Sequence, residues 1–66
     1  MALVTKIKAY RERVGMKQTE LAERVNARRE TIVHLESGKY NPSLKLAMDI
    51  AKVFGTTVEE LFEFTD

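Results

Sequence analysis

The hydrophobic residues of this chain recur with the spacing of an α-helix in several successive segments. In the first segment the apolar positions are four, three and four residues apart: Leu3, Ile7, Tyr10 and Val14. Because residues at this spacing share one face of a helix, the pattern predicts a helix from about Thr5 to Val14. Gly15 follows it, and glycine readily adopts the left-handed conformation in which many helices end.

Two shorter apolar patterns come next, and few residues separate them. A helix is expected at about residues 18–25, with its apolar face formed by Leu21, Ala22 and Val25. Another is expected at about residues 28–37, where Ile32 and Leu35 face inward and Gly38 follows.

The connection between these two helices, Val25-Asn26-Ala27, is unusually short. Asn26 is the kind of non-glycine residue that tolerates a left-handed turn. Two helices joined so closely must cross steeply. The small side chain of Ala22 fits where the first helix presses on the second. These features together are typical of a helix-turn-helix.

Further along, Asn41-Pro42-Ser43 marks the start of a fourth helix. Proline suits a helix start, and Ser43 is a suitable N-cap. The predicted buried face of this helix consists of Leu44, Ala47, Ile50, Ala51 and Phe54, and Gly55 ends it. The strongest core candidates of the whole chain are Tyr10, Leu21, Ile32, Leu35, Ile50 and Phe54.

The last residues predict one more helix and a strand. Thr57 and Glu60 have the spacing of a capping box, so a short fifth helix should cover Val58 to Leu61. Residues 62–65 alternate apolar and polar, as an edge strand does, and residues 2–4 could pair with them. The sequence therefore predicts one all-α domain, residues 1–66, of five short helices with a small terminal pair of strands.

The composition limits the chemistry open to this chain. Its 66 residues include no cysteine and one histidine, His34, which excludes disulfides, thiolate metal sites and multi-histidine metal sites. We expect no cofactor and no small-molecule ligand. A core this small often needs a partner for stability, so dimerisation is the most available additional source. The net charge of +1 says little about nucleic acid, because the placement of charges matters more than their sum.

The motif pattern resembles the Cro/C1-type (XRE) helix-turn-helix family from about Ile7 to Phe62. The resemblance is carried by Gln18-Thr19-Glu20-Leu21-Ala22, Asn26, Thr31-Ile32, Leu35-Glu36-Ser37-Gly38-Lys39, Asn41-Pro42-Ser43-Leu44, Ala47, Ile50-Ala51, Phe54-Gly55 and Val58-Glu59-Glu60-Leu61-Phe62. It implies a lambda-repressor-like DNA-binding fold with its helix-turn-helix at residues 18–37. The tail is also similar to small stand-alone members of the cytolysin repressor type, which implies a dimerisation segment at residues 57–66.

This resemblance implies a role for particular residues. The base-reading positions correspond to Arg29, Glu30 and His34. The positions near the DNA backbone correspond to Lys17, Gln18, Arg28, Thr31, Lys39 and Asn41. Arg11 and Glu36 match a pair that forms an internal salt bridge in the family, and the dimer interface would include Val58, Leu61, Phe62 and Phe64. Lys17 and Arg28 stand where the family prefers a capping Ser or Thr, so both helices of the motif should begin without a side-chain cap.

Each assignment has a simpler alternative. The segment 28–30 could be a solvated helix start with a local charge pair, and His34 could be an ordinary surface histidine. Glu30 could orient Arg29 or His34 instead of contacting a base. The apolar tail could cover the core of its own chain instead of forming half of a two-fold interface.

The sequence thus predicts a sequence-specific double-stranded DNA-binding regulator of transcription. We expect a repressor that binds a palindromic operator as a homodimer. The alternative is an antitoxin or another protein-interaction module with the same fold. An enzyme is not expected, since no catalytic constellation or phosphate-binding glycine loop is present. With no secretion signal in the first residues and no apolar run of about 20 residues, a soluble, cytoplasmic protein without membrane association is expected.

Overall fold

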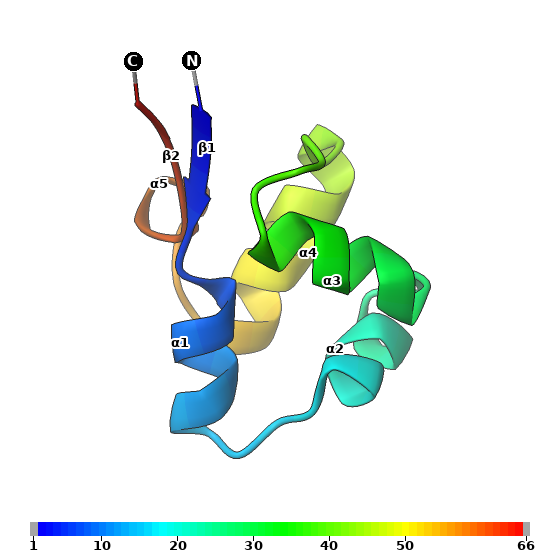
Figure 1. Ribbon diagram of the computed structural model, residues 1–66. Helices are drawn as coiled ribbons and strands as arrows, with labels where there is room; N and C mark the ends of the chain where they lie inside the picture. The colour runs from blue at the N-terminus through cyan, green and yellow to red at the C-terminus, as the bar shows by residue number, and fades with distance from the viewer. Residues whose placement is uncertain (1, 66) are drawn as a thin grey trace.

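The computed structural model describes residues 2–65 and contains five short helices, which separate the two terminal strands along the chain, while the strands themselves lie side by side (Figure 1). In chain order the elements are β1 (Ala2–Thr5), α1 (Ile7–Arg13), α2 (Gln18–Arg24), α3 (Arg29–Glu36), α4 (Leu44–Phe54), α5 (Val58–Leu61) and β2 (Phe62–Thr65). All five predicted helices and the predicted strand pair are present. The predicted fold class is therefore confirmed.

The first four helices end in the same hydrogen-bonded motif. Each is followed by one residue with a positive φ, and these residues are Gly15, Asn26, Gly38 and Gly55. After α2, the N–H of Asn26 donates to the carbonyl of Glu23 at 3.3 Å, and the N–H of Ala27 donates to that of Ala22 at 2.8 Å. This pair of bonds satisfies carbonyls that the end of a helix leaves without partners. Asn26, at φ 55°, therefore takes the left-handed role that the sequence assigned to it.

The helix starts also follow the local sequence. The hydroxyl of Ser43 accepts from the N–H of Leu46 at 3.1 Å, and that of Thr57 accepts from the N–H of Glu60 at 3.2 Å. Pro42 precedes the cap of α4 and so lies outside the helix. Lys17 and Arg28, the N-cap residues of α2 and α3, make no side-chain cap hydrogen bond, as predicted. At the start of α2, however, the carboxylate of Glu20 accepts from the backbone N–H of Lys17 at 3.4 Å.

The core lies where all five helices meet. Its largest fully buried side chains are Ile7, Leu21, Ile32, Leu35, Ile50 and Leu61. Two other predicted core residues, Tyr10 and Phe54, are half-buried at its edge, with ring centroids 5.8 Å apart.

Two positions of the predicted apolar faces were wrong. Leu3 is buried on β1, as the predicted strand pair requires, and does not share the helical stripe of Ile7, because α1 begins only at Ile7. Val14 is 61% exposed, because α1 ends before it and the chain turns away at Gly15. Leu44 is 73% exposed, because the first turn of α4 lies outside the core, and Leu46 packs against the core instead.

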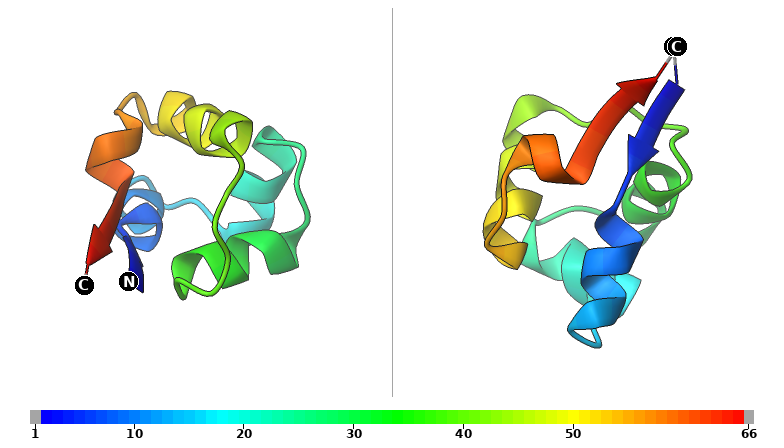
Figure 2. Two further views of the ribbon diagram at one scale, coloured as in Figure 1. Left: turned by 90° about the horizontal axis from the view of Figure 1, so that it is seen from above. Right: turned by 90° about the vertical axis from the view of Figure 1, so that its left-hand side faces the viewer.

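The two ends of the chain form an antiparallel sheet of two strands, which projects from the helices (Figure 2). Leu3 pairs with Phe64 and Val4 with Glu63 in its register. The same sheet contacts the residue after α3, because a Cβ on Gly38 would clash with the carbonyl oxygen of Leu3. Gly38 therefore serves both the left-handed helix end and the close approach of β1.

Replacing Gly38 with alanine should destabilise the fold far more than the same change at Gly15. Both glycines have a positive φ, at +75° and +70°, so both variants incur the left-handed strain of about 1–2 kcal/mol. Only Gly38→Ala adds a clash with backbone, worth a further ~1–3 kcal/mol, because nothing lies within 4 Å of a Cβ at Gly15. Thermal unfolding checks this, at about 4–8 °C per kcal/mol. Equal losses of stability in the two variants would show that β1 does not press on α3.

Candidate nucleic-acid interface

The helices α2 and α3 are held at a fixed angle by buried apolar contacts and the left-handed turn between them (Figure 1). Leu21 of α2 and Ile32 and Leu35 of α3 are completely buried. Ala22, 3% exposed, packs in the same cluster and also accepts the hydrogen bond that closes the turn. The inward face of α3 is therefore anchored, which leaves its outward face available.

The outward face of α3 carries the three residues expected to read bases. Arg29 and Glu30 occupy its first turn, His34 lies one turn beyond Glu30, and all three are exposed. Within residues 2–65, no hydrogen bond or ion pair connects any two of these side chains. Glu30 is thus not engaged in orienting Arg29 or His34, and its carboxylate can accept from an external donor.

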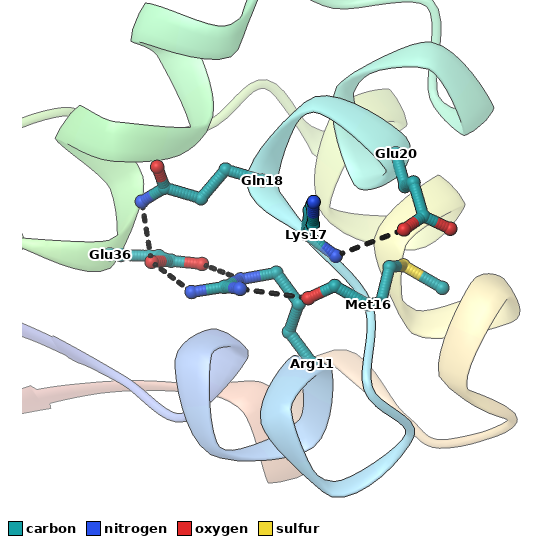
Figure 3. A network of polar contacts seen from close by, with 6 residues as sticks. All are labelled: Arg11, Met16, Lys17, Gln18, Glu20 and Glu36. Carbon is teal, nitrogen blue, oxygen red and sulfur yellow. Dashed lines mark hydrogen bonds and ion pairs between the residues drawn. The ribbon is translucent and has the colours of Figure 1, made fainter.

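A network of polar side chains fixes α3 against α1 and α2 (Figure 3). The guanidinium of Arg11 donates through Nε to Glu36 Oε2 at 2.7 Å and through Nη2 to Glu36 Oε1 at 3.2 Å. Its Nη1 donates to the carbonyl of Met16 at 2.8 Å. Arg11 is 9% exposed, so the pair is shielded from water, and the hydrogen bond to Glu36 raises the pKa of Arg11. The buried pair therefore favours the charged form of Arg11.

Gln18 is the third member of this network. Its Nε2 donates to Glu36 Oε1 at 3.1 Å, which draws the side chain of the first residue of α2 toward the end of α3 (Figure 3). The amide keeps one N–H and its carbonyl oxygen for other partners. The contact with Glu36 was not foreseen from the sequence, because it joins residues 18 positions apart.

The expected backbone-contacting residues lie near both ends of α3. A hollow beside it is lined by Lys8, Arg11, Lys17, Gln18, Thr19 and Arg29. A groove on another side is lined in part by Asn26, Thr31, Tyr40 and Ser43. Arg28 precedes α3, while Lys39 and Asn41 follow it in the segment before α4, and all three are exposed. Lys8 and Tyr40 also line these surfaces, but the sequence analysis did not single them out, because the apolar pattern of the chain marks them only as surface positions.

The predicted dimerisation residues do not all lie on one surface. Val58, Phe62 and Phe64 line an apolar groove together with Leu3, Asn41, Pro42, Leu44 and Ala47. Leu61 was wrongly placed in the interface, because it is 1% exposed and belongs to the core of its own chain. Leu44, wrongly expected in the core, lies in the groove instead. The groove thus lies between the terminal sheet and the start of α4.

The helix-turn-helix family designated HTH_3 matches residues 7–61 of this chain. The chain belongs to the XRE-type helix-turn-helix family. An uncharacterized HTH-type transcriptional regulator of Archaeoglobus fulgidus is 58% identical over 62 residues, which cover 94% of this chain and 89% of that protein. This confirms the resemblance in the motif pattern. The family and the names of its members indicate a DNA-binding transcriptional regulator, not an enzyme.

Solved structures agree on the fold. A crystal structure of a protein from Bacteroides fragilis aligns with a TM-score of 0.81 at 23% identity, covering 92% of this chain and 98% of that one. A chain of the SinR protein/SinI protein complex aligns with a TM-score of 0.75 at 27% identity, covering 82% of this chain and 53% of that one. Among the described residues, no helix of this XRE-type protein is long and apolar enough to cross a membrane.

Replacing Glu36 with glutamine should destabilise the protein by about 3 kcal/mol, because the buried guanidinium of Arg11 then lacks a counter-charge. Asp49→Asn is the matched control, since Lys45 and Asp49 also form an ion pair at 2.7 Å, but the side chain of Lys45 is 85% exposed. That variant should lose no more than about 0.5 kcal/mol. Urea denaturation of the two variants measures the difference. Similar losses of stability in both would mean that the Arg11–Glu36 pair does not hold α3 in place.

Proposed function

We propose that this XRE-type protein is a sequence-specific repressor that binds a palindromic operator in double-stranded DNA as a homodimer in the cytoplasm. The observation that carries the proposal is the outward face of α3. The opposite face of the helix is anchored in the core, so this face has a fixed position. It exposes Arg29, Glu30 and His34, which form no ion pair with one another, and exposed cations lie beside it. Helices of this kind fit the major groove, where each base pair presents a distinct edge.

The three side chains differ in what they can recognise. Arg29 can donate two parallel hydrogen bonds to guanine O6 and N7. The ionised carboxylate of Glu30 can only accept, so the amino group of cytosine is its natural partner. His34, one helical turn from Glu30, can donate to the N7 of a purine. Together these residues account for a short base sequence in each half-site.

The surrounding polar residues set the register on the duplex. Lys17 and Arg28 are cations at the starts of α2 and α3, and neither side chain caps its helix, so a phosphate there would meet both the charge and the first backbone N–H groups of the helix. Gln18, Thr31, Lys39 and Asn41 complete the proposed backbone contacts. A phosphate there would supply the acceptor that a Ser or Thr cap supplies elsewhere, which explains why two local rules are broken on the same face.

Repression requires only that the protein occupies its operator. A dimer bound across a promoter excludes other proteins from the same DNA and does not need to contact those proteins.

Selection from a pool of random duplexes tests this proposal. The wild type should enrich a two-fold symmetric sequence, and Arg29→Ala should lose preference at one base pair in each half-site, at a cost of about 1–3 kcal/mol. Lys39→Ala serves as the control, because removing a phosphate-binding side chain should weaken binding to all sequences alike. If Arg29→Ala keeps the wild-type base preference, Arg29 does not read a base. If no sequence is enriched at all, the antitoxin or protein-interaction alternative is favoured.

The proposed dimer uses the apolar groove between the terminal sheet and α4. Phe64 is 56% exposed and Leu44 is 73% exposed, and both line this groove with Val58 and Phe62. A second copy could cover the same residues, because a two-fold axis brings identical patches together. Burial of these side chains would also supplement the core of a chain of only 66 residues.

Phe64→Glu and Leu44→Glu should each shift the protein from dimer to monomer, because a carboxylate would have to be buried in the apolar interface. Val14→Glu is the control, since Val14 is similarly exposed, at 61%, but does not line the groove. Sedimentation equilibrium at micromolar concentration measures the result. A wild type that remains monomeric, or a control that dissociates equally, would contradict the proposed interface.

A further inference from the structure

The hollow beside the start of α3 brings together residues from three helices. Lys8 and Arg11 come from α1, Gln18 and Thr19 from the start of α2, with Lys17 just before them. Arg29 comes from the start of α3. Since α1 is not part of the helix-turn-helix, its presence in this hollow gives it a role that the motif alone does not assign.

The charge of this hollow comes from Lys8, Lys17 and Arg29. Arg11 contributes little net charge, because its guanidinium is paired with the carboxylate of Glu36. The three remaining cations are exposed, and none of the described residues that line the hollow is acidic. Thr19 and Gln18 add a hydroxyl and an amide N–H. Such a set of cations and neutral donors suits a phosphodiester oxygen.

The buried ion pair fixes the face of α1 that carries Lys8. Lys8 and Arg11 are three residues apart, so they lie on neighbouring parts of the same face of α1. Because Arg11 is bonded to Glu36 at the end of α3, this face of α1 cannot rotate away from α2 and α3. Lys6, two residues before Lys8, is also exposed but does not line the hollow.

We infer that Lys8 binds a DNA phosphate in this hollow, so that α1 extends the interface beyond the helix-turn-helix. This inference rests on the proposed DNA binding and adds a contact to it. The contact of Lys8 carries no direct base preference, because the phosphate that it would bind is the same at every base pair.

The test compares Lys8→Gln with Lys6→Gln, two variants with the same change in charge at exposed positions two residues apart in the chain. Dissociation constants for the selected duplex are measured at several salt concentrations. When one lysine no longer neutralises a phosphate, the slope of log K against log salt concentration should become less steep by about 0.9. Lys8→Gln should show this change, so its affinity defect should shrink about 3-fold between 50 and 200 mM salt. Lys6→Gln should keep the wild-type slope, and both variants should keep the wild-type base preference.

Ethylation interference gives a second measurement on the same proteins. Ethylating the phosphate that occupies the hollow should weaken the wild type and Lys6→Gln by more than it weakens Lys8→Gln, because Lys17 and Gln18 still contact that phosphate in the Lys8→Gln variant. Equal slopes for Lys8→Gln and the wild type, or equal changes in both variants, would overturn the role of Lys8 while leaving the proposed function intact. A wild type that binds no duplex would overturn both.

Discussion

The buried ion pair between Arg11 and Glu36 is the constraint on which the geometry of the interface depends. It joins the end of α1 to the end of α3, and the amide of Gln18 connects the start of α2 to the same carboxylate. Buried pairs of this kind contribute little net stability when compared with apolar residues, but removing one partner is costly. The value of this pair therefore lies in fixing orientation: three helices of seven, seven and eight residues are held in one arrangement.

Two other close contacts hold α3 from its ends. At its start, the left-handed turn at Asn26 and the small side chain of Ala22 allow α2 to approach. At its end, Gly38 lies against the carbonyl of Leu3, so the terminal sheet is packed directly on the helix. The sheet also forms one wall of the proposed dimer groove. In the proposed dimer, the sheet that contacts the second copy would therefore pack directly on the residue that follows α3, without a flexible linker between the interface and the helix.

The polar residues of the proposed interface fall into two groups, according to whether they already have partners within the protein. Arg11 and Glu36 bind each other and have a structural role. The side chains of Arg29, Glu30 and His34 form no hydrogen bond or ion pair with one another, so their polar atoms are available to external partners. The starts of α2 and α3, where a cation replaces a capping side chain, belong to the same group. Places where the local sequence breaks a folding preference often coincide with binding sites, and both of these places lie beside the proposed base-reading residues.

The sequence by itself determined the elements and their ends. Apolar spacing predicted five helices, and local chemistry predicted where they stop, because caps and left-handed residues act within a few positions of the chain. Only the tertiary structure decided which surface positions come together. It placed Leu44 in a groove and Leu61 in the core, and it brought Lys8, Lys17 and Arg29 to one hollow. Periodicity shows which face of a helix is apolar, but what covers that face, and which charges meet across helices, depends on packing between distant segments.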